Sequence, residues 1–391
     1  MENMEQIWNS SVHTFHGKIF LRITKTRKTI DNIGGQDWRS LENFVEDYSV
    51  TTNAFGTPLS AAKAATDALQ TMHHYPARDT EPAKTQLANF LSINENSNNI
   101  QKRLVLGNGA SELIDLCIRL APGKTWRAGP CEPQYQEYAR SAANYKRTKL
   151  PFQSQSADLL CIVNPSNPTG KYFTVNDMMH NLENAWNVPH GSTVIVDESM
   201  QPWIGSLWRE ESLISKGEWI SFMAHEKQIK IFIIHSWTKL WSCTGLRVGS
   251  ILCPTDHDCL NISRYQVPWS MNSAAIAFLA AVVKDEEYLN KTWKWTSIWR
   301  AQLCEGLSRI FPNWTFHGAN FISFIWIDTH NESVAQECVL QCRKGGMPIR
   351  WGGLGYESPT CIRIAVRSNE KNQLLIQCLN TITKIKNYTI V

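Results

Sequence analysis

The segment His235–Gly249, with the sequence HSWTKLWSCTGLRVG, carries the residue types best suited to covalent chemistry. It continues Lys230–His235, an apolar run typical of a buried strand. Lys239 therefore stands at the mouth of an apolar strand, where it is poorly hydrated. Desolvation lowers the pKa of a lysine, so that its neutral amine can attack a carbonyl carbon.

Possible phosphate ligands surround this lysine in the sequence. Ser236 and Thr238 supply hydroxyls, and Arg247 follows eight residues after Lys239 in a Gly-Leu-Arg-Val-Gly run. Hydroxyl and guanidinium donors of this kind bind phosphate oxygens. A lysine nucleophile beside a phosphate site indicates pyridoxal phosphate (PLP) held as a Schiff base. A surface lysine in a loop rich in serine and threonine explains this stretch, taken alone, equally well.

Two further strand ends offer ligand-binding groups. Leu159–Val163 is an apolar run followed by Asn164–Gly170, a rigid loop with two Asn-Pro pairs. In open parallel sheets, ligands bind at such carboxyl ends of strands. Thr193–Val196 is a similar run and is followed by Asp197. A buried carboxylate needs a partner, which could be a protonated pyridine nitrogen or the N-terminus of a helix.

The glycine turn Gly107–Glu112 follows a short apolar run at Arg103–Leu106 and precedes a predicted helix. Backbone N–H groups and the positive end of the helix dipole make such a turn an anion site. An ordinary strand-to-helix turn with Ser111 as N-cap is the plainer interpretation.

The composition argues against several classes of protein. The chain has 391 residues, 43% hydrophobic and 19% charged, which predicts a globular protein with more than one core. A net charge of +4 argues against nucleic-acid binding, and no apolar stretch has the length of a membrane span. The eleven cysteines form no CxxC pair, so we expect reduced thiols in a cytoplasmic protein and no metal site. Cys338 and Cys342 are interpreted as packing residues of a helix.

Alternating strands and helices must position these residues. Strands and helices alternate in the first part of the chain, and the pattern predicts an α/β domain followed by a smaller α+β domain. The other expected strands lie near Trp126 and at Ser250–Cys253, Ile322–Ile327, Met347–Arg350 and Cys361–Val366. The expected helices include Pro58–Met72, Thr85–Leu91, one that ends near Lys284, Ser333–Lys344 and Glu370–Ile385.

In this order and at this spacing, the motifs resemble those of fold type I PLP enzymes of the class I/II aminotransferase superfamily. The most similar subgroup is histidinol-phosphate aminotransferase together with threonine-phosphate decarboxylase. The resemblance covers about Asp47 to the C-terminus. DYSVTTNAFGTP at 47–58, SWTK at 236–239 and QVPWSMN at 266–272 are most similar to the decarboxylases.

This resemblance implies an α/β fold of the PLP-dependent transferase type, with a mainly parallel sheet and a smaller α+β C-terminal domain. Residues 1–46 would form an arm that packs on the small domain. Residues 47–285 would form the large PLP-binding domain, and residues 286–391 the small one.

The resemblance also assigns the cofactor site. Lys239, Asp197 and Tyr135 would be catalytic: Lys239 forms the Schiff base, Asp197 bonds the ring nitrogen and Tyr135 stacks on the ring. Asn167 would bond the phenolic oxygen of the ring. The cofactor phosphate would be held by Gly109, Ala110, Ser111, Ser236, Thr238 and Arg247.

The substrate would contact three further residues. Arg363 matches the arginine that binds the α-carboxylate, Arg350 falls where the distal group is contacted, and Asn53 belongs to the same site. Tyr75 matches a tyrosine that reaches the cofactor phosphate of the neighbouring subunit, which implies a homodimer.

One departure from the family concerns the reaction type. Aminotransferases of the family usually have Asp-Glu-Ala-Tyr where this chain has Asp197-Glu-Ser-Met200, and methionine has no donor for the phenolic oxygen. We therefore expect an aminotransferase-like enzyme acting on an L-α-amino acid. The alternative is a lyase that decarboxylates its substrate, or that eliminates from and cyclises a hydroxylated arginine-like amino acid. Nearby tryptophans, interpreted either as an aromatic lining of the substrate site or as core, are Trp203, Trp237, Trp241 and Trp269.

Overall fold

The computed structural model describes residues 37–93 and 96–388. Most of the predicted N-terminal arm, up to residue 36, lies outside the described residues.

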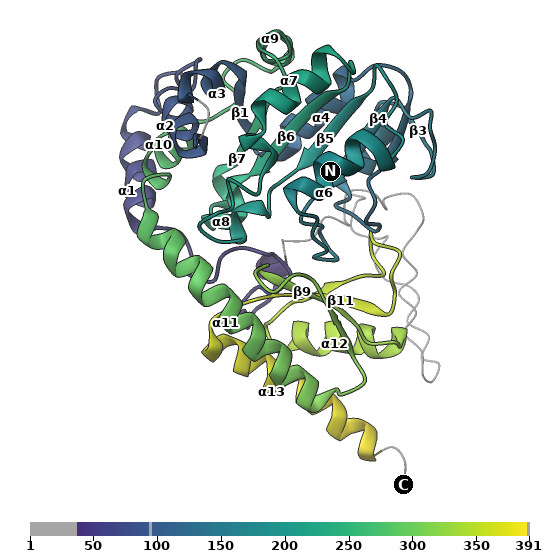
Figure 1. The fold of residues 1–391 in the computed structure, drawn as a ribbon. Helices are drawn as coiled ribbons and strands as arrows, with labels where there is room; N and C mark the ends of the chain where they lie inside the picture. Colours follow the sequence, from purple (N-terminus) through teal and green to yellow (C-terminus); the bar gives the residue numbers. More distant parts are fainter. Residues whose placement is uncertain (1–36, 94–95, 389–391) are drawn as a thin grey trace, which may run out of the picture. The chain divides into compact units, whose positions relative to one another are not determined.

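Seven of the described strands form one sheet, in the upper part of Figure 1. They are β1 (Leu104–Asn108), β2 (Thr125–Ala128), β3 (Thr148–Lys149), β4 (Leu159–Val163), β5 (Thr193–Asp197), β6 (Lys230–Ser236) and β7 (Val248–Leu252). The order across the sheet is β1-β7-β6-β5-β4-β2-β3. Neighbours from β3 to β6 are parallel, whereas β7 is antiparallel to both β6 and β1.

The central strands are buried on both faces because their side chains alternate between two hydrophobic clusters. In β4, Leu160 and Ile162 pack in one cluster, and Leu159 and Cys161 pack in the other. Successive strand residues point to opposite faces, so a sheet covered on both sides needs a continuous apolar run. This requirement explains why the sequence pattern located β4, β5 and β6.

Helices cover this sheet and connect it to a second one. Those preceding residue 285 are α1 (Leu59–Ala68), α2 (Ala83–Leu91), α3 (Ser97–Arg103), α4 (Ala110–Leu120), α5 (Glu137–Asn144), α6 (Val175–His180), α7 (Gly217–His225), α8 (Trp237–Leu240), α9 (Asp256–Tyr265) and α10 (Ser273–Val282). The 25-residue helix α11 (Glu286–Ile310) then runs from the side of α10 to the second sheet (Figure 1).

The second sheet is antiparallel and has the order β10-β11-β9-β8. Its strands are β8 (Thr315–His317), β9 (Phe324–Asp328), β10 (Arg350–Trp351) and β11 (Cys361–Ala365). Helices α12 (Glu332–Lys344) and α13 (Asn369–Tyr388) share a hydrophobic cluster with this sheet. Cys338 and Cys342 lie fully buried in that cluster, which confirms them as packing residues.

The described part of the N-terminal segment lies against this smaller sheet. Its first element is the 3-10 turn η1 (Asp37–Ser40). Val45 N–H donates to the carbonyl of Gly346 at 2.8 Å, and Tyr48 N–H donates to the carbonyl of Pro348 at 2.9 Å. These backbone bonds fasten the segment just before it enters the region of Lys239.

Some expected elements differ from the structure. The helix expected at Pro58–Met72 ends at Ala68 and continues as the 3-10 turn η2 (Leu69–Thr71). The strand expected at Met347–Arg350 is only the two-residue β10, because Pro348 has no N–H to pair. The sequence analysis did not identify α3, α5, α6, α7, α8, α9 and α11. Several of these helices, such as α3, α6 and α8, are too short to show a clear apolar periodicity.

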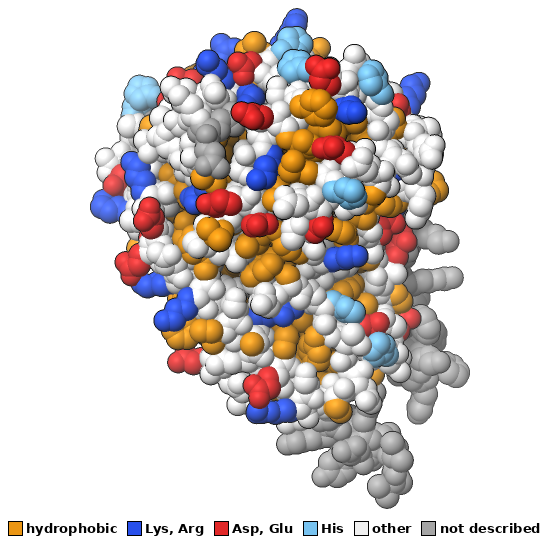
Figure 2. All heavy atoms as spheres, viewed as in Figure 1, with side chains coloured by type: hydrophobic (Ala, Val, Ile, Leu, Met, Phe, Trp, Pro, Cys, Tyr) orange, Lys and Arg blue, Asp and Glu red, His pale blue; other side chains and the backbone are white. Residues whose placement is uncertain are grey.

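The surface seen in Figure 2 mixes both signs of charge: acidic and basic side chains are interspersed among apolar ones. Among the described helices, none combines the length and the hydropathy needed to cross a membrane.

Candidate active site

A cavity of about 620 Å³ lies where the carboxyl ends of β4, β5 and β6 face β11 and the N-terminal segment. It brings together most of the residues predicted to hold the cofactor and the substrate. Its lining consists of Trp38, Arg39, Ser49, Val50, Thr51, Ala110, Ser111, Tyr135, Val163, Asn167, Asp197, Ser199, Met200, Ser236, Lys239, Thr244, Gly245, Arg247, Tyr356 and Arg363.

Lys239 lies in the short helix α8, directly after β6. Its Nζ donates to Thr238 Oγ1 at 3.1 Å and to Ser236 Oγ at 3.4 Å. Desolvation lowers the pKa of Lys239 to about 8; the positive charge of Arg247 adds to this, whereas Asp197 opposes it. An amine with this pKa is neutral in about a tenth of the molecules at pH 7, far more than an ordinary lysine, and the neutral form is the nucleophile.

The start of α4 forms an anion cradle with Arg247. Gly109 precedes the helix with φ of 79°, and a Cβ at this position would overlap the guanidinium of Arg247. Arg247 has a left-handed backbone, with φ of 62°. Gly249 packs so closely on the backbone of Ala110 that it leaves no room for a side chain either. The free N–H groups of α4 and a guanidinium therefore converge, an arrangement that fits a phosphate dianion.

Two hydroxyls complete this cradle. Ser236 Oγ and Thr238 Oγ1 lie 2.9 Å apart, and both are within reach of Lys239 Nζ. The pKa of Tyr135 is raised to about 12, mainly by burial, and its hydroxyl is hydrogen-bonded to Ser111. The Tyr135 ring thus lies at the same end of the cavity as the start of α4.

Asp197 is the last residue of β5 and has only 4% of its surface exposed. Burial raises the pKa of this carboxyl, and hydrogen bonds oppose the rise. The N–H of Ser199 donates to Oδ1 at 2.9 Å, and the Tyr138 hydroxyl donates to Oδ2 at 3.0 Å. A carboxylate supported in this way suits a cationic ring nitrogen as partner. The sequence analysis missed Tyr138, although its place three residues after Tyr135 on an emerging helix was a usable signal.

Arg363 enters the cavity from β11 and is 7% exposed. Its Nη1 donates to Asn167 Oδ1 at 2.5 Å and to the Tyr356 hydroxyl at 3.5 Å, and its Nη2 donates to the carbonyl of Ser49 at 2.6 Å. Its Nε has no hydrogen-bond partner within the described part of the chain. A buried guanidinium with an unused donor and no carboxylate partner among the described residues fits a substrate carboxylate.

A model of the aminotransferase class I and II family matches residues 45–379. The chain belongs to this family. Membership confirms the fold type I architecture, the class of PLP-dependent enzyme and the PLP cofactor expected from the sequence.

Individual relatives of this family are distant. A histidinol-phosphate aminotransferase of Methylobacillus flagellatus is 24% identical over 351 residues, covering 85% of this chain and 88% of its own. The crystal structure of the histidinol-phosphate aminotransferase from Clostridium acetobutylicum has a TM-score of 0.72 at 22% identity and covers 86% of this chain and 99% of that one. That of L-threonine-O-3-phosphate decarboxylase from Porphyromonas gingivalis has a TM-score of 0.70 at 17% identity, with coverages of 87% and 100%. At these identities the structures establish the fold.

Five residues that the family resemblance assigned to the site do not line the cavity themselves. Gly109 and Thr238 contact residues that do, Arg247 and Lys239 respectively, whereas Asn53, Arg350 and Tyr75 have other surroundings. Asn53 is buried, and its Nδ2 donates to the Leu240 carbonyl and to Thr292 Oγ1. Its side-chain amide thus fastens the Lys239 loop to α11. Arg350 donates to the carbonyl of Leu354 at 3.1 Å and lies over the Tyr356 ring at 5.6 Å. Tyr75, 77% exposed, stacks on Trp269 with ring centroids 4.4 Å apart.

Of the two interpretations of the tryptophans near the motifs, the structure favours packing outside the cavity. Trp203, Trp237 and Trp241 are almost fully buried in the hydrophobic core, and Trp269 packs on Tyr75 outside the cavity. Trp203, Trp237 and Trp241 come after the ends of β5 and β6, where the chain returns to the core, so proximity in sequence did not decide between the two interpretations. The tryptophan that does line the cavity is Trp38, which the sequence analysis did not select. Met200, by contrast, lies in the cavity wall as its position in the family motif implied.

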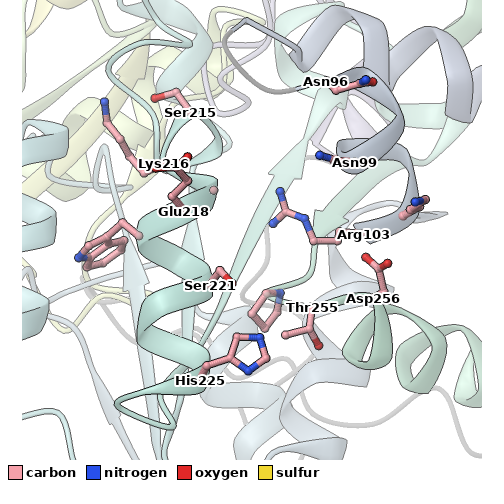
Figure 3. Close-up of a pocket in the computed structure, with 14 residues that line it drawn as sticks. Asn96, Asn99, Arg103, Ser215, Lys216, Glu218, Ser221, His225, Thr255 and Asp256 are labelled. Carbon is pink, nitrogen blue, oxygen red and sulfur yellow. The ribbon is translucent and has the colours of Figure 1, made fainter.

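A larger cavity of about 990 Å³ lies between α3, α7 and the start of α9 (Figure 3). Arg103 points into it from one side, and Ser221 and His225 line the other. This cavity shares no lining residue with the cavity of Lys239. The larger of these two cavities therefore lacks both Lys239 and the residues that would hold a phosphate.

Proposed function

We propose that this protein transforms an L-α-amino acid in the Lys239 cavity, through PLP held by that lysine as a Schiff base. The observation that carries this proposal is one cavity lined by Lys239, by Asp197 and, on the facing side, by Arg363. The three groups match a cofactor aldehyde, its ring nitrogen and a substrate carboxylate in turn. When bound, PLP supplies an electron sink for the substrate Cα.

Each side chain then has a distinct task. Gly109, Ala110, Ser111, Ser236, Thr238 and Arg247 hold the phosphate. Asp197 keeps the ring nitrogen protonated, and Tyr138 keeps Asp197 ionised by donating to it. Arg363 would bind the α-carboxylate and so orient the substrate in the cavity. Lys239 would hold the cofactor and would also remove or return the proton at Cα.

The outcome at Cα is transamination or a lyase reaction. Met200 supports the lyase alternative, because it lines the cavity beside Asp197 where a phenol donor is usual in aminotransferases. Without that phenol, Asn167 is the predicted donor to the phenolic oxygen. The lyase reaction would be a decarboxylation, or an elimination and ring closure.

A half-reaction assay separates these outcomes. The purified protein should show a visible cofactor band, and an amino acid substrate should change it. An aminotransferase leaves pyridoxamine phosphate and a keto acid. Added α-ketoglutarate then takes the amino group from pyridoxamine phosphate, which yields glutamate and restores PLP. A lyase returns the original band and leaves an amine or a cyclised product. If PLP gives no visible band with this protein, the proposal fails.

The proposed active unit is a homodimer in which Tyr75 reaches the cofactor phosphate of the neighbouring subunit. Tyr75 lies outside its own cavity and is 77% exposed. Other large apolar side chains are also exposed near it in the sequence: Leu59, Leu69, Met72 and, around Trp269, Tyr265 and Val267. A surface of this kind on a soluble protein indicates an interface.

Subunit mixing tests this arrangement. Lys239→Ala and Tyr75→Ala homodimers should both be impaired. A mixed dimer has one site with intact Lys239 and with intact Tyr75 from the other subunit, so mixing should restore activity. If mixing restores nothing, or if sedimentation finds a fully active monomer, Tyr75 does not act across an interface.

A further inference from the structure

The N-terminal segment places two residues in the cavity wall that no family motif predicted. Trp38 and Arg39 belong to η1, and both line the Lys239 cavity. Arg343 on α12 donates to Ser40 Oγ at 2.8 Å, and Asn43 Nδ2 donates to the carbonyl of Lys344 at 2.7 Å. The segment is therefore tied to the end of α12 while its other face meets the cavity.

Trp38 and Arg39 form a unit at the mouth of this cavity. The guanidinium carbon of Arg39 lies 5.4 Å from the Trp38 ring centroid, a cation–π contact. Trp38 is 53% exposed although it is a large apolar residue. Arg39 has no hydrogen-bond or ion-pair partner within the residues described. An aromatic ring and an unpaired cation thus remain available at the opening.

The charges around the cavity indicate what Arg39 binds. The lining contains four cationic side chains, those of Arg39, Lys239, Arg247 and Arg363, but only one carboxylate, that of Asp197. In the proposed function, Lys239 bonds to the cofactor, Arg247 binds its phosphate and Arg363 binds the α-carboxylate. Asp197 pairs with the ring nitrogen. Arg39 is then the cation in this lining without a counterpart.

We propose that Arg39 and Trp38 recognise the distal end of the substrate side chain, and that this end is an anion, a carboxylate or a phosphate. Arg39 pairs with the anion and Trp38 covers the side chain that carries it. This inference rests on the proposed function. The distal group of the substrate would then be bound by the N-terminal segment and not by Arg350, which does not line the cavity.

The cation–π contact between Arg39 and Trp38 argues against a substrate whose side chain carries a guanidinium. The Trp38 ring, which could stack on a planar cation, already faces the Arg39 guanidinium. A second guanidinium would meet that positive charge at close range without a described carboxylate nearby to offset it. The elimination and ring closure of an arginine-like amino acid is therefore the disfavoured branch of the proposed chemistry.

The test uses pairs of amino acids that differ only in the distal charge, with the holoenzyme and its cofactor absorbance as readout. The pairs are L-glutamate and L-glutamine, L-aspartate and L-asparagine, and O-phospho-L-threonine and L-threonine. We expect the acidic member of at least one pair to bind more tightly. The pair that responds tells a carboxylate from a phosphate.

Arg39→Gln should reduce that preference about 10- to 100-fold, the contribution of a charged hydrogen bond, and leave the uncharged partner unchanged. Arg39→Lys should keep part of it, and Trp38→Ala should weaken binding of both members of the pair. Arg309→Gln is the matched control, because Arg309 pairs with Glu305 on the exposed face of α11. It should leave every pair as in the wild type.

Three results overturn the inference: no acidic preference in the wild type, equal losses for both members of a pair in Arg39→Gln, or tighter binding of L-arginine than of the acids. A wild-type protein with no cofactor band is a different failure. It removes the proposed function, and the inference with it.

Discussion

Tyr138→Phe tests how the protein keeps Asp197 ionised. The variant retains the buried ring and removes one hydroxyl, which donates to Asp197 Oδ2 at 3.0 Å. The other donors to this carboxylate come from Ser199, through its backbone N–H and its side chain. A hydrogen bond to a charged group contributes about 1.5–3 kcal/mol. Since 1.4 kcal/mol is a factor of about ten, we expect PLP to bind about 10- to 100-fold more weakly.

The pKa of Asp197 determines in which direction the pH dependence of PLP binding shifts in Tyr138→Phe. Burial raises the pKa of Asp197, and the bonds from Ser199 and Tyr138 oppose the rise. Without the Tyr138 donor, the pKa of Asp197 rises further. The carboxylate that pairs with the ring nitrogen is lost as pH falls through this pKa. In Tyr138→Phe, the acid loss of cofactor binding therefore starts at a higher pH than in the wild type.

Equilibrium dialysis of PLP against the protein across a pH series measures both effects. Tyr145→Phe is the control, because its hydroxyl also donates to an aspartate, Asp115 at 2.6 Å, at the partly exposed end of α5. That variant should bind PLP as the wild type does. If the two variants give the same affinity and the same pH profile, the Tyr138 hydroxyl does not support Asp197 and the reasoning is wrong.

Three further predictions concern the cofactor and the carboxylate. Lys239→Ala should lose the visible band, and borohydride should no longer attach the cofactor to the protein. In the wild type, the bond between Lys239 and the cofactor should form faster as the pH rises through about 8, the pKa of Lys239, because only the neutral amine attacks. Gly109→Ala should weaken PLP binding, since its Cβ displaces Arg247 and its backbone, with φ of 79° and ψ of 163°, adds about 1–3 kcal/mol of strain for a residue other than glycine, whereas pyridoxal, which lacks the phosphate, should lose less. Arg363→Ala should raise the amino acid concentration for half-maximal rate about 10- to 100-fold with a smaller change in PLP retention, and an unchanged requirement would refute its carboxylate role.

The sequence predicted best where one local pattern had one physical cause. Strands β4, β5 and β6 are apolar on both faces, so their residues are continuous in sequence as well as in space. Asp197 is the last residue of β5 and Lys239 comes three residues after the end of β6, and parallel neighbours place their carboxyl ends together. Register pairs Asp197 with Ile234, five residues before Lys239. The core of the site therefore follows from strand order alone.

Residues that reach the site from elsewhere were harder to predict. Trp38 and Arg39 line the cavity only because Val45 and Tyr48 are bonded to the chain around Pro348, some 300 residues later. The periodicity of apolar residues within a short segment does not predict a contact between residues so far apart in the sequence. The place of Trp203, Trp237 and Trp241 stayed open for a different reason, because an aromatic residue beside a catalytic motif packs equally well into the core.

In the proposed site, Asn167 would link recognition of the substrate to the state of the cofactor ring. Its Oδ1 accepts from Arg363 Nη1 at 2.5 Å, which leaves its Nδ2 to donate. That donor would be available to the phenolic oxygen of the ring, and Met200 offers no second one. A carboxylate that binds Arg363 competes for the donor that orients Asn167. Occupation of the carboxylate site would then change the hydrogen bond to the ring, so that substrate binding itself helps set where the proton at Cα is returned.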